Sequence, residues 1–499
     1  MVNDQKNDAS PEKREELINV LGSSIKESTL FLETLLVEKK ALKEVTITRE
    51  IKVLNAFVDL GIFVNYVNIE LSSITRACLR AKILAEKQYN LKFINCIILE
   101  SYKYLYGYGK GVKKSFWIKN IAPIRKVVND PQVIEDLEKI EKLIIEFRDC
   151  NITNKDNRDL SIHYDLDPFL IYDMLRELNE YDEIQRVLAF LPLFSELHSF
   201  ANGYILKHIR QCFVDPRFQE EIKRILTPKR FSYFDTGLAS SLDKKIIGNK
   251  KYIDWLISKQ KGIQQLAMQE KDNVSVEPLH LTSQILKVQT FIYLLIIDLY
   301  SATKTFIMSE YSIEKQLCLK HINTIIYEGF NKLYGVDNNE GTYWDSYILQ
   351  VENKLKNVSN ERLSDQLNQK LQILRPTIKG FAEQRKLSVH LEDGIEEIYY
   401  MLVNLKPIVE LQKPVDFTET IIQVLFQLLS MLNLIDKQLD KDSKSIRLNT
   451  IQTAEKILAQ LKKSPDCQEK EEKIQLMQQM ISGEFFDNLN KKVFGKKGL

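Results

Sequence analysis

The chain has 499 residues, of which 44% are hydrophobic and 28% charged, a balance that excludes a largely disordered protein. Its net charge of +2 gives no overall attraction to nucleic acid, so any surface for such a partner has to be local. The six cysteines include no Cys-x-x-Cys pair, which gives no sign of a zinc or redox motif. Scattered cysteines and a polar N-terminus without the apolar segment of a signal peptide predict a cytoplasmic protein.

Helix signals dominate the first half of the chain. The 12 prolines and 17 glycines are few for this length, and apolar residues recur with the helical period. We expect an N-terminal helical extension over residues 1–50 and a helical bundle over 51–213. Within this bundle Gly107 is a natural helix C-cap, and Asp167-Pro168 is a typical helix start.

The second half follows the same pattern after a less regular stretch. Residues 214–282 predict a partly helical connector, 283–435 a second bundle, and 436–499 a charged helical tail. The apolar runs at 291–300 and 420–435 are short for a membrane span, so they predict buried core helices and no membrane association. No segment alternates apolar and polar residues as a strand would. The expected fold class is therefore all-α.

The two predicted bundles share sequence at an offset that stays constant apart from one single-residue slip. The matching blocks are LESYKYLYG (99–107) with YEGFNKLYG (327–335), Phe116-Trp117 with Tyr343-Trp344, RDLSIH (158–163) with RKLSVH (385–390), and YDMLREL (172–178) with YYMLVNL (399–405). These blocks include two of only three tryptophans and two of only six histidines, which favours a duplication over coincidence. The alternative is a chance likeness of two Lys- and Leu-rich helical stretches, whose matched apolar positions reflect only a similar core.

Each copy carries an Arg-x-x-x-x-His motif, Arg158 with His163 and Arg385 with His390. Five positions on a straight helix correspond to about 140° of rotation, so the two side chains would not share a face. In both copies a loop follows the motif, so the histidine can leave the helical path and approach the arginine. This pair suits RNA cleavage, because imidazole exchanges protons near neutral pH and arginine binds phosphate oxygens. The 2′-hydroxyl of RNA supplies the nucleophile without a metal.

A helical domain with such a motif near a helix end resembles the HEPN superfamily, which includes metal-independent ribonucleases, toxins and phage-defence proteins. In active members two HEPN domains pack so that both motifs line one cleft. The resemblance implies two HEPN-like bundles, an RNA-cleaving or RNA-binding effector, RNA as partner, no action on DNA, and no cofactor or metal. It implies a composite catalytic site of Arg158, His163, Arg385 and His390. Supporting residues would be Asp159 and Lys386, after the arginines, and the matched acids Glu100 and Glu328, which could orient the motif.

A non-catalytic helical scaffold or protein-interaction module is the alternative. Arg and His at a helix end can simply cap carbonyl groups and favour the helix dipole. Glu100 and Glu328 would then make structural ion pairs. Trp117 and Trp344 could stack on bases, but core packing is the favoured interpretation. The basic loop with Lys110, Lys113 and Lys114 predicts a solvated surface, since acidic residues occupy the matching loop of the second copy.

Overall fold

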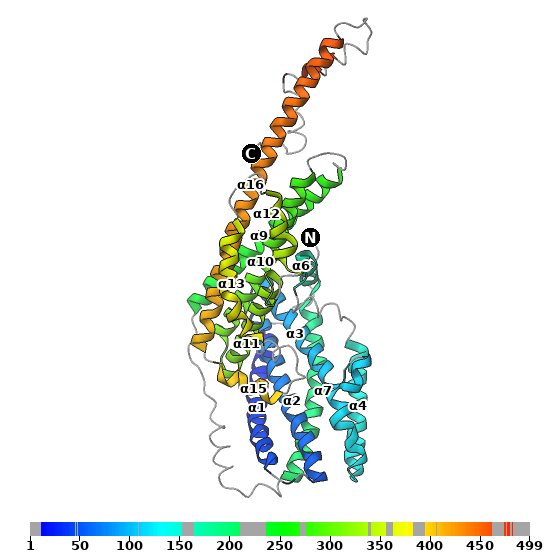
Figure 1. The fold of residues 1–499 in the computed structure, drawn as a ribbon. Coiled ribbons are helices and arrows are strands. Elements are labelled where there is room, and N and C mark those ends of the chain that lie inside the picture. Colours follow the sequence, from blue (N-terminus) through cyan, green and yellow to red (C-terminus); the bar gives the residue numbers. More distant parts are fainter. Residues whose placement is uncertain are drawn as a thin grey trace.

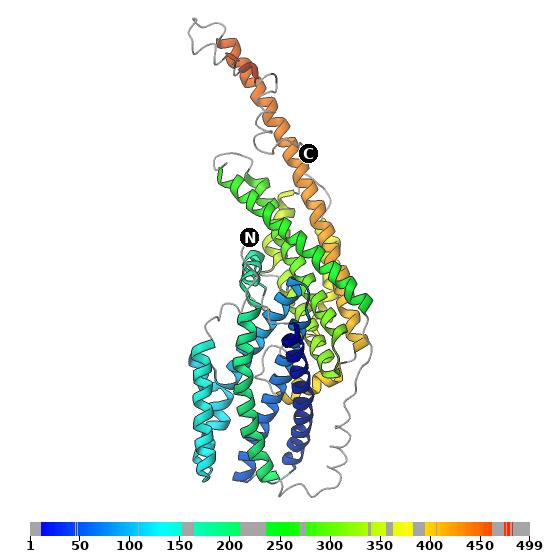
Figure 2. The same cartoon turned by 180° about the vertical axis from the view of Figure 1, so that it is seen from behind.

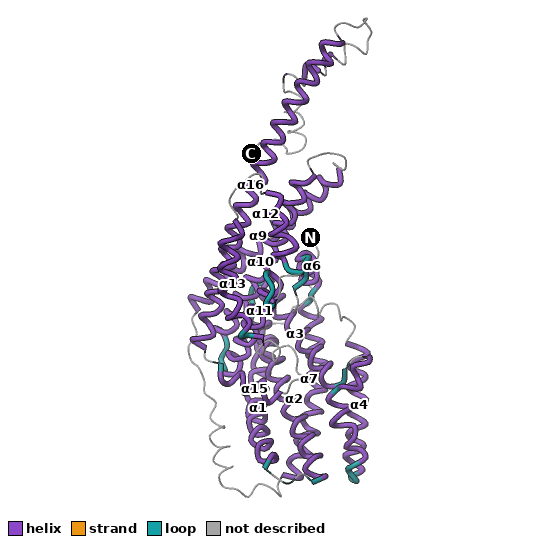
Figure 3. The backbone as a smooth tube through the Cα atoms, in the orientation of Figure 1, coloured by secondary structure: helices purple, strands orange, loops and turns teal. Residues whose placement is uncertain are grey.

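The computed structural model describes residues 11–44, 46, 48–107, 109–151, 164–209, 236–269, 276–337, 341–355, 363–382, 395–405, 407–461 and short pieces between 474 and 482. Helices make up the secondary structure of this part of the chain, and it contains no β-strand (Figure 3). The prediction of an all-α fold is confirmed.

The first half contains a series of helices, most of them long (Figure 1). They are α1 (Pro11–Lys43), α2 (Arg49–Arg80), α3 (Leu84–Leu105), α4 (Pro131–Asn151), α6 (Pro168–Glu177) and α7 (Glu180–Ile209), with the short helical segments η1 (Gly109–Lys114), η2 (Trp117–Ile121) and η3 (Ala122–Lys126) between α3 and α4. As the sequence predicts, α6 begins at Pro168. The Asp167 carboxylate caps it by accepting a 3.2 Å hydrogen bond from the Phe169 backbone N–H.

The second half has a matching order of helices. They are α9 (Thr236–Gln269), α10 (Val276–Met308), α11 (Ser312–Leu333), η4 (Trp344–Ile348), α12 (Leu349–Leu355), α13 (Leu363–Lys379), α15 (Ile395–Asn404) and α16 (Pro407–Leu461). The packing repeats as well: α1 lies along α2 as α9 lies along α10, and α7 covers α2 as α16 covers α10. Seen from both sides, α16 extends well beyond the other helices (Figures 1 and 2).

Two segments predicted as an extension and a connector take part in the main packing. The region 1–50 contributes α1, which buries Ile25, Leu32 and Leu36 against the bundle. The region 214–282 contributes the 34-residue helix α9, which is longer and more regular than the expected connector. One continuous apolar core runs through both halves. The described part of the predicted connector therefore packs one face of α9 on the core.

The ends of α3 and α11 are built alike. Gly107 and Gly335 have positive φ values of 79° and 85°, and the N–H of each bonds at 3.2 Å to the carbonyl five residues earlier. A residue with a side chain would be strained in this conformation. Beyond each turn a π-helical segment starts at Trp117 or Trp344, and both indoles are buried, with 0% and 2% exposure. The core interpretation of the tryptophans is confirmed, and a base-stacking role is not available to them.

In the described part of the chain, three helical stretches are long and apolar enough to cross a membrane by length and composition, namely Arg49–Arg80, Glu277–Met308 and Gln412–Ile435. The first two are 83% buried inside the protein, so the run at 291–300 is a core helix as predicted. The third is only 33% buried. The prediction that the run at 420–435 is buried is wrong for one face of α16, which no described helix covers and where Phe426 is 65% exposed.

Gly329 on α11 marks a close approach to α10. A Cβ atom at this position would lie 2.4 Å from Leu295 Cδ1 and 2.7 Å from Cδ2, and Leu295 is fully buried. We expect Gly329→Ala to lower the free energy of unfolding by about 1–3 kcal/mol, because the packed core has to shift. Gly203→Ala on α7, where a Cβ meets nothing within 4 Å, should instead stabilise by about 0.5–1 kcal/mol. Urea denaturation of both variants tests this, and equal effects would contradict the close packing.

Candidate functional site

The two predicted motifs lie outside the described residues. This applies to Arg158, Asp159, His163, Arg385, Lys386 and His390. Along the chain, the first motif falls in the interval 152–163 between α4 and α6. The second falls in the interval 383–394 between α13 and α15. The motifs therefore occupy corresponding places in the order of helices.

The two matched acids, Glu100 and Glu328, are described and lie in the last turns of α3 and α11. They are 7% and 6% exposed. The Glu100 carboxylate is 3.6 Å from the Lys103 ammonium, one helical turn away. Near Glu328, burial lowers the pKa of Lys332, and the charges of Asp165 and Glu328 oppose this shift. Both acids thus sit in charged surroundings at the helix ends that precede the two motif-bearing regions.

The residues that directly follow the first motif are anchored on the second half of the chain. Tyr164, next to His163 in sequence, is buried and donates a 2.7 Å hydrogen bond to Asp298 Oδ2 on α10. The carbonyl groups of Asp165 and Leu166 accept hydrogen bonds from the hydroxyls of Tyr343 and Tyr347, at 2.8 and 3.2 Å. The chain that leaves the first motif is therefore held against helices of the other half.

Buried ion pairs join the halves, and they are reciprocal. Lys92 on α3 contacts Asp298 on α10 at 2.5 Å, and Lys320 on α11 contacts Glu70 on α2 at 2.6 Å. Lys92 corresponds to Lys320, and Glu70 to Asp298, at the same offset of the repeat that relates the block at 99–107 to that at 327–335. All four side chains are at most 7% exposed. Each half thus supplies the acid for the other half's lysine, at equivalent positions.

A second reciprocal set lies nearer the α2–α3 and α10–α11 corners. Arg76 contacts Glu314 at 2.9 Å, and Lys304 contacts Glu86 at 2.6 Å. Arg76 again corresponds to Lys304, and Glu86 to Glu314, at this offset. In a two-fold arrangement of similar units, each contact between two residues is repeated by their equivalents with the units exchanged. The two sets of ion pairs follow this rule.

One pair of equivalent positions makes direct contact. Phe93 and His321, which also correspond at this offset, have ring centroids 4.6 Å apart. Two equivalent residues touch each other only close to an axis that relates their units. The Nε2 atom of His321 is 3.1 Å from Glu70 Oε1. The contact between the halves is thus centred near these two rings.

The surroundings at this interface shift the pKa values of Glu70 and His321. Burial by itself would raise the pKa of Glu70, but Lys320 and His321 outweigh it and lower that pKa to about 2. Burial lowers the pKa of His321, and Glu70 opposes the shift. Glu70 therefore remains ionised across the physiological range. Its contribution to stability is present above the ordinary carboxyl pKa of 4.5 and is lost as pH falls towards 2.

The interface residues were not among those predicted from sequence, although a signal was present. Charged residues stand inside the apolar helices α2, α3, α10 and α11 at the offset of the repeat, at positions 70, 76, 86 and 92 and again at 298, 304, 314 and 320. Buried charges need partners. Applied to the repeat, this rule indicates equivalent buried charges in the two halves, each of which needs a counterion.

No family model matches this chain, and neither a curated protein nor a solved structure does. Among the described residues, no group of three or more His, Cys, Asp or Glu side chains is placed to hold a metal ion. The interpretation of the site therefore rests on the sequence motifs and on the geometry of the two halves.

We expect Lys320→Met to lower the free energy of unfolding by about 3–5 kcal/mol, because it leaves the Glu70 carboxylate buried without its main counterion. Adding Glu70→Leu should recover most of this loss, since the double variant buries no lone charge. The matched control is Lys43→Met, which breaks the more exposed ion pair with Glu396 and should cost about 0–1 kcal/mol. A double-mutant cycle by urea denaturation measures these values. A Lys320→Met cost no larger than that of Lys43→Met would show that the pair is not a determinant of the interface.

Proposed function

We propose that the chain is a tandem duplication of a HEPN-like helical unit and acts as a metal-independent endoribonuclease. The observation that carries the proposal is the set of reciprocal ion pairs between the halves. In Lys92–Asp298 the first half supplies the lysine and the second half the acid. At equivalent positions, Lys320–Glu70 has the lysine in the second half and the acid in the first. Active HEPN proteins pair two such domains, and here the pair would be formed within one chain.

The placement of the motif-bearing segments supports the same proposal. Along the chain, the two motifs lie between corresponding helices. Each motif also follows a helix with a buried glutamate near its C-terminal end, Glu100 in α3 and Glu328 in α11. Tyr164 bonds to Asp298, which is also the counterion of Lys92 at the interface. An ion pair that joins the halves therefore also holds the chain that leaves the first motif.

The chemistry assigned to the motifs follows from their residue types. A neutral His163 or His390 would remove the proton from an RNA 2′-hydroxyl, and the other histidine would protonate the leaving 5′-oxygen. The oxygen attacks the adjacent phosphorus and leaves a 2′,3′-cyclic phosphate. Arg158 and Arg385 would bind the non-bridging phosphate oxygens, where negative charge develops. This activity fits a toxin or phage-defence setting in the cytoplasm, which is part of the proposal.

Cleavage should require RNA and no metal. The purified protein, incubated with labelled RNA in EDTA, should release products with 2′,3′-cyclic phosphate ends. Matched DNA and RNA with 2′-O-methyl groups should remain intact, because neither offers the nucleophile. The rate should fall on the acid side of the histidine titration, where the base becomes protonated. Cutting of the DNA, or activity only after Mg²⁺ is added, would refute this mechanism.

His163→Ala and His390→Ala should each abolish cleavage while the melting temperature stays nearly unchanged, because a cleft side chain contributes little to packing and such substitutions usually cost within about 0.5 kcal/mol. The matched control is His280→Ala on α10, an exposed histidine outside the motifs, which should leave cleavage unchanged. Loss of several kcal/mol of stability in either motif variant would favour the alternative, a helical scaffold in which these histidines are structural.

A further inference from the structure

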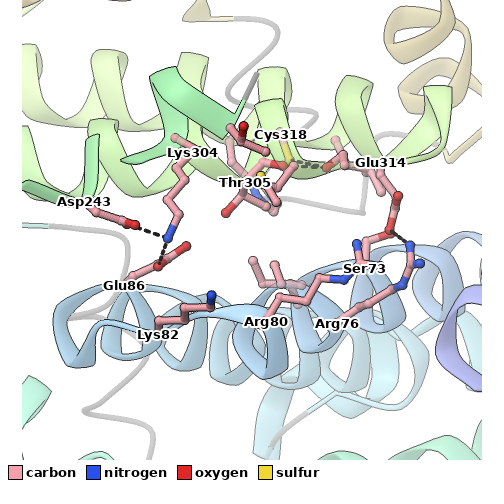
Figure 4. A pocket seen from close by; sticks show the side chains of 18 of the residues that line it. Ser73, Arg76, Arg80, Lys82, Glu86, Asp243, Lys304, Thr305, Glu314 and Cys318 are labelled. Carbon is pink, nitrogen blue, oxygen red and sulfur yellow. Dashed lines mark hydrogen bonds and ion pairs between the residues drawn. The ribbon is translucent and has the colours of Figure 1, made fainter. Parts of the chain in front are cut away.

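A cavity of about 330 Å³ lies between the two halves, at the corners where α2 meets α3 and α10 meets α11 (Figure 4). The ion pair of Arg76 with Glu314 stands at one end of it, and that of Lys304 with Glu86 at the other. The described residues that line it lie outside the two motif-bearing intervals of the sequence, and α9 closes one side with Asp243. The proposed cleavage chemistry makes no use of it.

The acids in the cavity wall are already engaged. Glu314 accepts from Arg76, Glu70 contacts Lys320 and His321, and Glu86 and Asp243 share Lys304, with 2.6 Å from its ammonium to each. These carboxylates therefore have counterions within the protein. They present little uncompensated negative charge to a ligand.

Two unsatisfied polar groups on the α2 side of the wall can donate hydrogen bonds, while Asp243 Oδ1 on α9, which also has no hydrogen-bond partner among the described residues, is balanced in charge by Lys304. The Ser73 hydroxyl and the Arg76 Nε atom are buried and have no hydrogen-bond partner among the described residues. Lys82 is exposed at the cavity and has no ion-pair partner in the described part of the chain. Arg80, one helical turn from Arg76, shares Glu310 with it and is partly exposed. A buried donor without an acceptor costs free energy, and a ligand rich in acceptors removes this cost.

The remaining wall is apolar. Ile74, Ala77, Met308 and Leu317 come from both halves and face the cavity beside the donors. Burial raises the pKa of the Cys318 thiol in this wall to about 12, so it stays protonated and is no nucleophile. The cavity thus combines donors on one face of α2 with an apolar surface, and it is large enough for a small organic molecule.

We propose that this cavity binds a small organic anion, with a phosphate or carboxylate group at Ser73, Arg76 and Arg80 and an apolar or planar body against Met308 and Leu317. Lys82 attracts the anion at the entrance. Because the wall comes from both halves, the bound molecule stabilises their association. The proposal is independent of RNA cleavage, since it concerns binding alone.

Binding is measured by calorimetry and by thermal shift on the full-length protein with AMP, phenyl phosphate and phenylacetate as probes. Inorganic phosphate represents the anionic group alone, and adenosine represents the planar part of the ligand alone. We expect at least one organic anion to bind and raise the melting temperature, and the partial ligands to bind more weakly. Retention of binding in the His163→Ala/His390→Ala variant separates this cavity from the proposed cleavage site. The proposal is overturned if none of the organic anions binds at millimolar concentration, or if binding requires the motif histidines.

Substitutions locate the site. Ser73→Ala should weaken binding about tenfold, the usual effect of losing a hydrogen bond to a charged group, while the unliganded protein stays as stable as before or becomes more stable. The control is Ser301→Ala, because Ser301 occupies the equivalent position of the second half, also has a buried hydroxyl without a partner among the described residues, and does not line the cavity. The affinity of the Ser301→Ala variant for the organic anion should not change. Equal losses in the two serine variants would overturn the assignment.

Two further variants test charge and volume. Lys82→Gln should weaken binding of the anions and leave that of adenosine unchanged, whereas Lys52→Gln, an exposed lysine at the other end of α2, should affect neither. Ala77→Leu should block binding by filling the cavity without removing a charge. Undiminished binding in both Lys82→Gln and Ala77→Leu would place the ligand elsewhere and overturn the proposal.

Discussion

The buried ion pairs between the halves are the constraint on which the rest of this structure depends. Burying a lysine or a glutamate costs several kcal/mol per charge, and attraction to a partner offsets this cost only at close range and with good geometry. Each half carries charges inside otherwise apolar helices, and their counterions belong to the other half. A displaced arrangement of the halves would leave Lys92, Lys320, Glu70 and Asp298 buried without partners. These pairs therefore select one arrangement more than they add net stability.

The helices and their boundaries could largely be predicted from local signals. Asp167-Pro168 begins α6, Gly107 ends α3 with a positive φ, and the absence of alternating segments agrees with an all-α fold. Interactions over long sequence distances could not be predicted in this way. The role of α9 in the core depends on its contact with α10, and the exposed side of the run at 420–435 depends on which helices cover α16. Hydrophobic periodicity identifies an apolar face but not what lies against it.

The same difference between local signals and long-range interactions applies to the candidate site. The Arg-x-x-x-x-His motifs can be found only in the sequence, since both lie outside the described residues. The interface and the cavity follow from geometry, because the sequence does not state which half supplies a counterion. The repeat offset would have indicated the charged positions, since Arg76 and Lys304 recur with Glu86 and Glu314. It would not have indicated that the pairs cross between the halves.

At some positions that correspond at the repeat offset, the two halves carry residues of different chemistry. Arg80 corresponds to Met308 and Lys82 to Glu310, so these two cations at the cavity have no cationic counterpart in the second half. Phe93 corresponds to His321, which makes the centre of the interface polar on one side only. Two separate identical subunits could not differ in this way, because every substitution would appear in both. In the proposed duplication, joining the units in one chain removes that restriction, so that the reciprocal pairs are kept while the surfaces beside them differ. The asymmetric cavity within an otherwise reciprocal interface is the physical consequence of this arrangement.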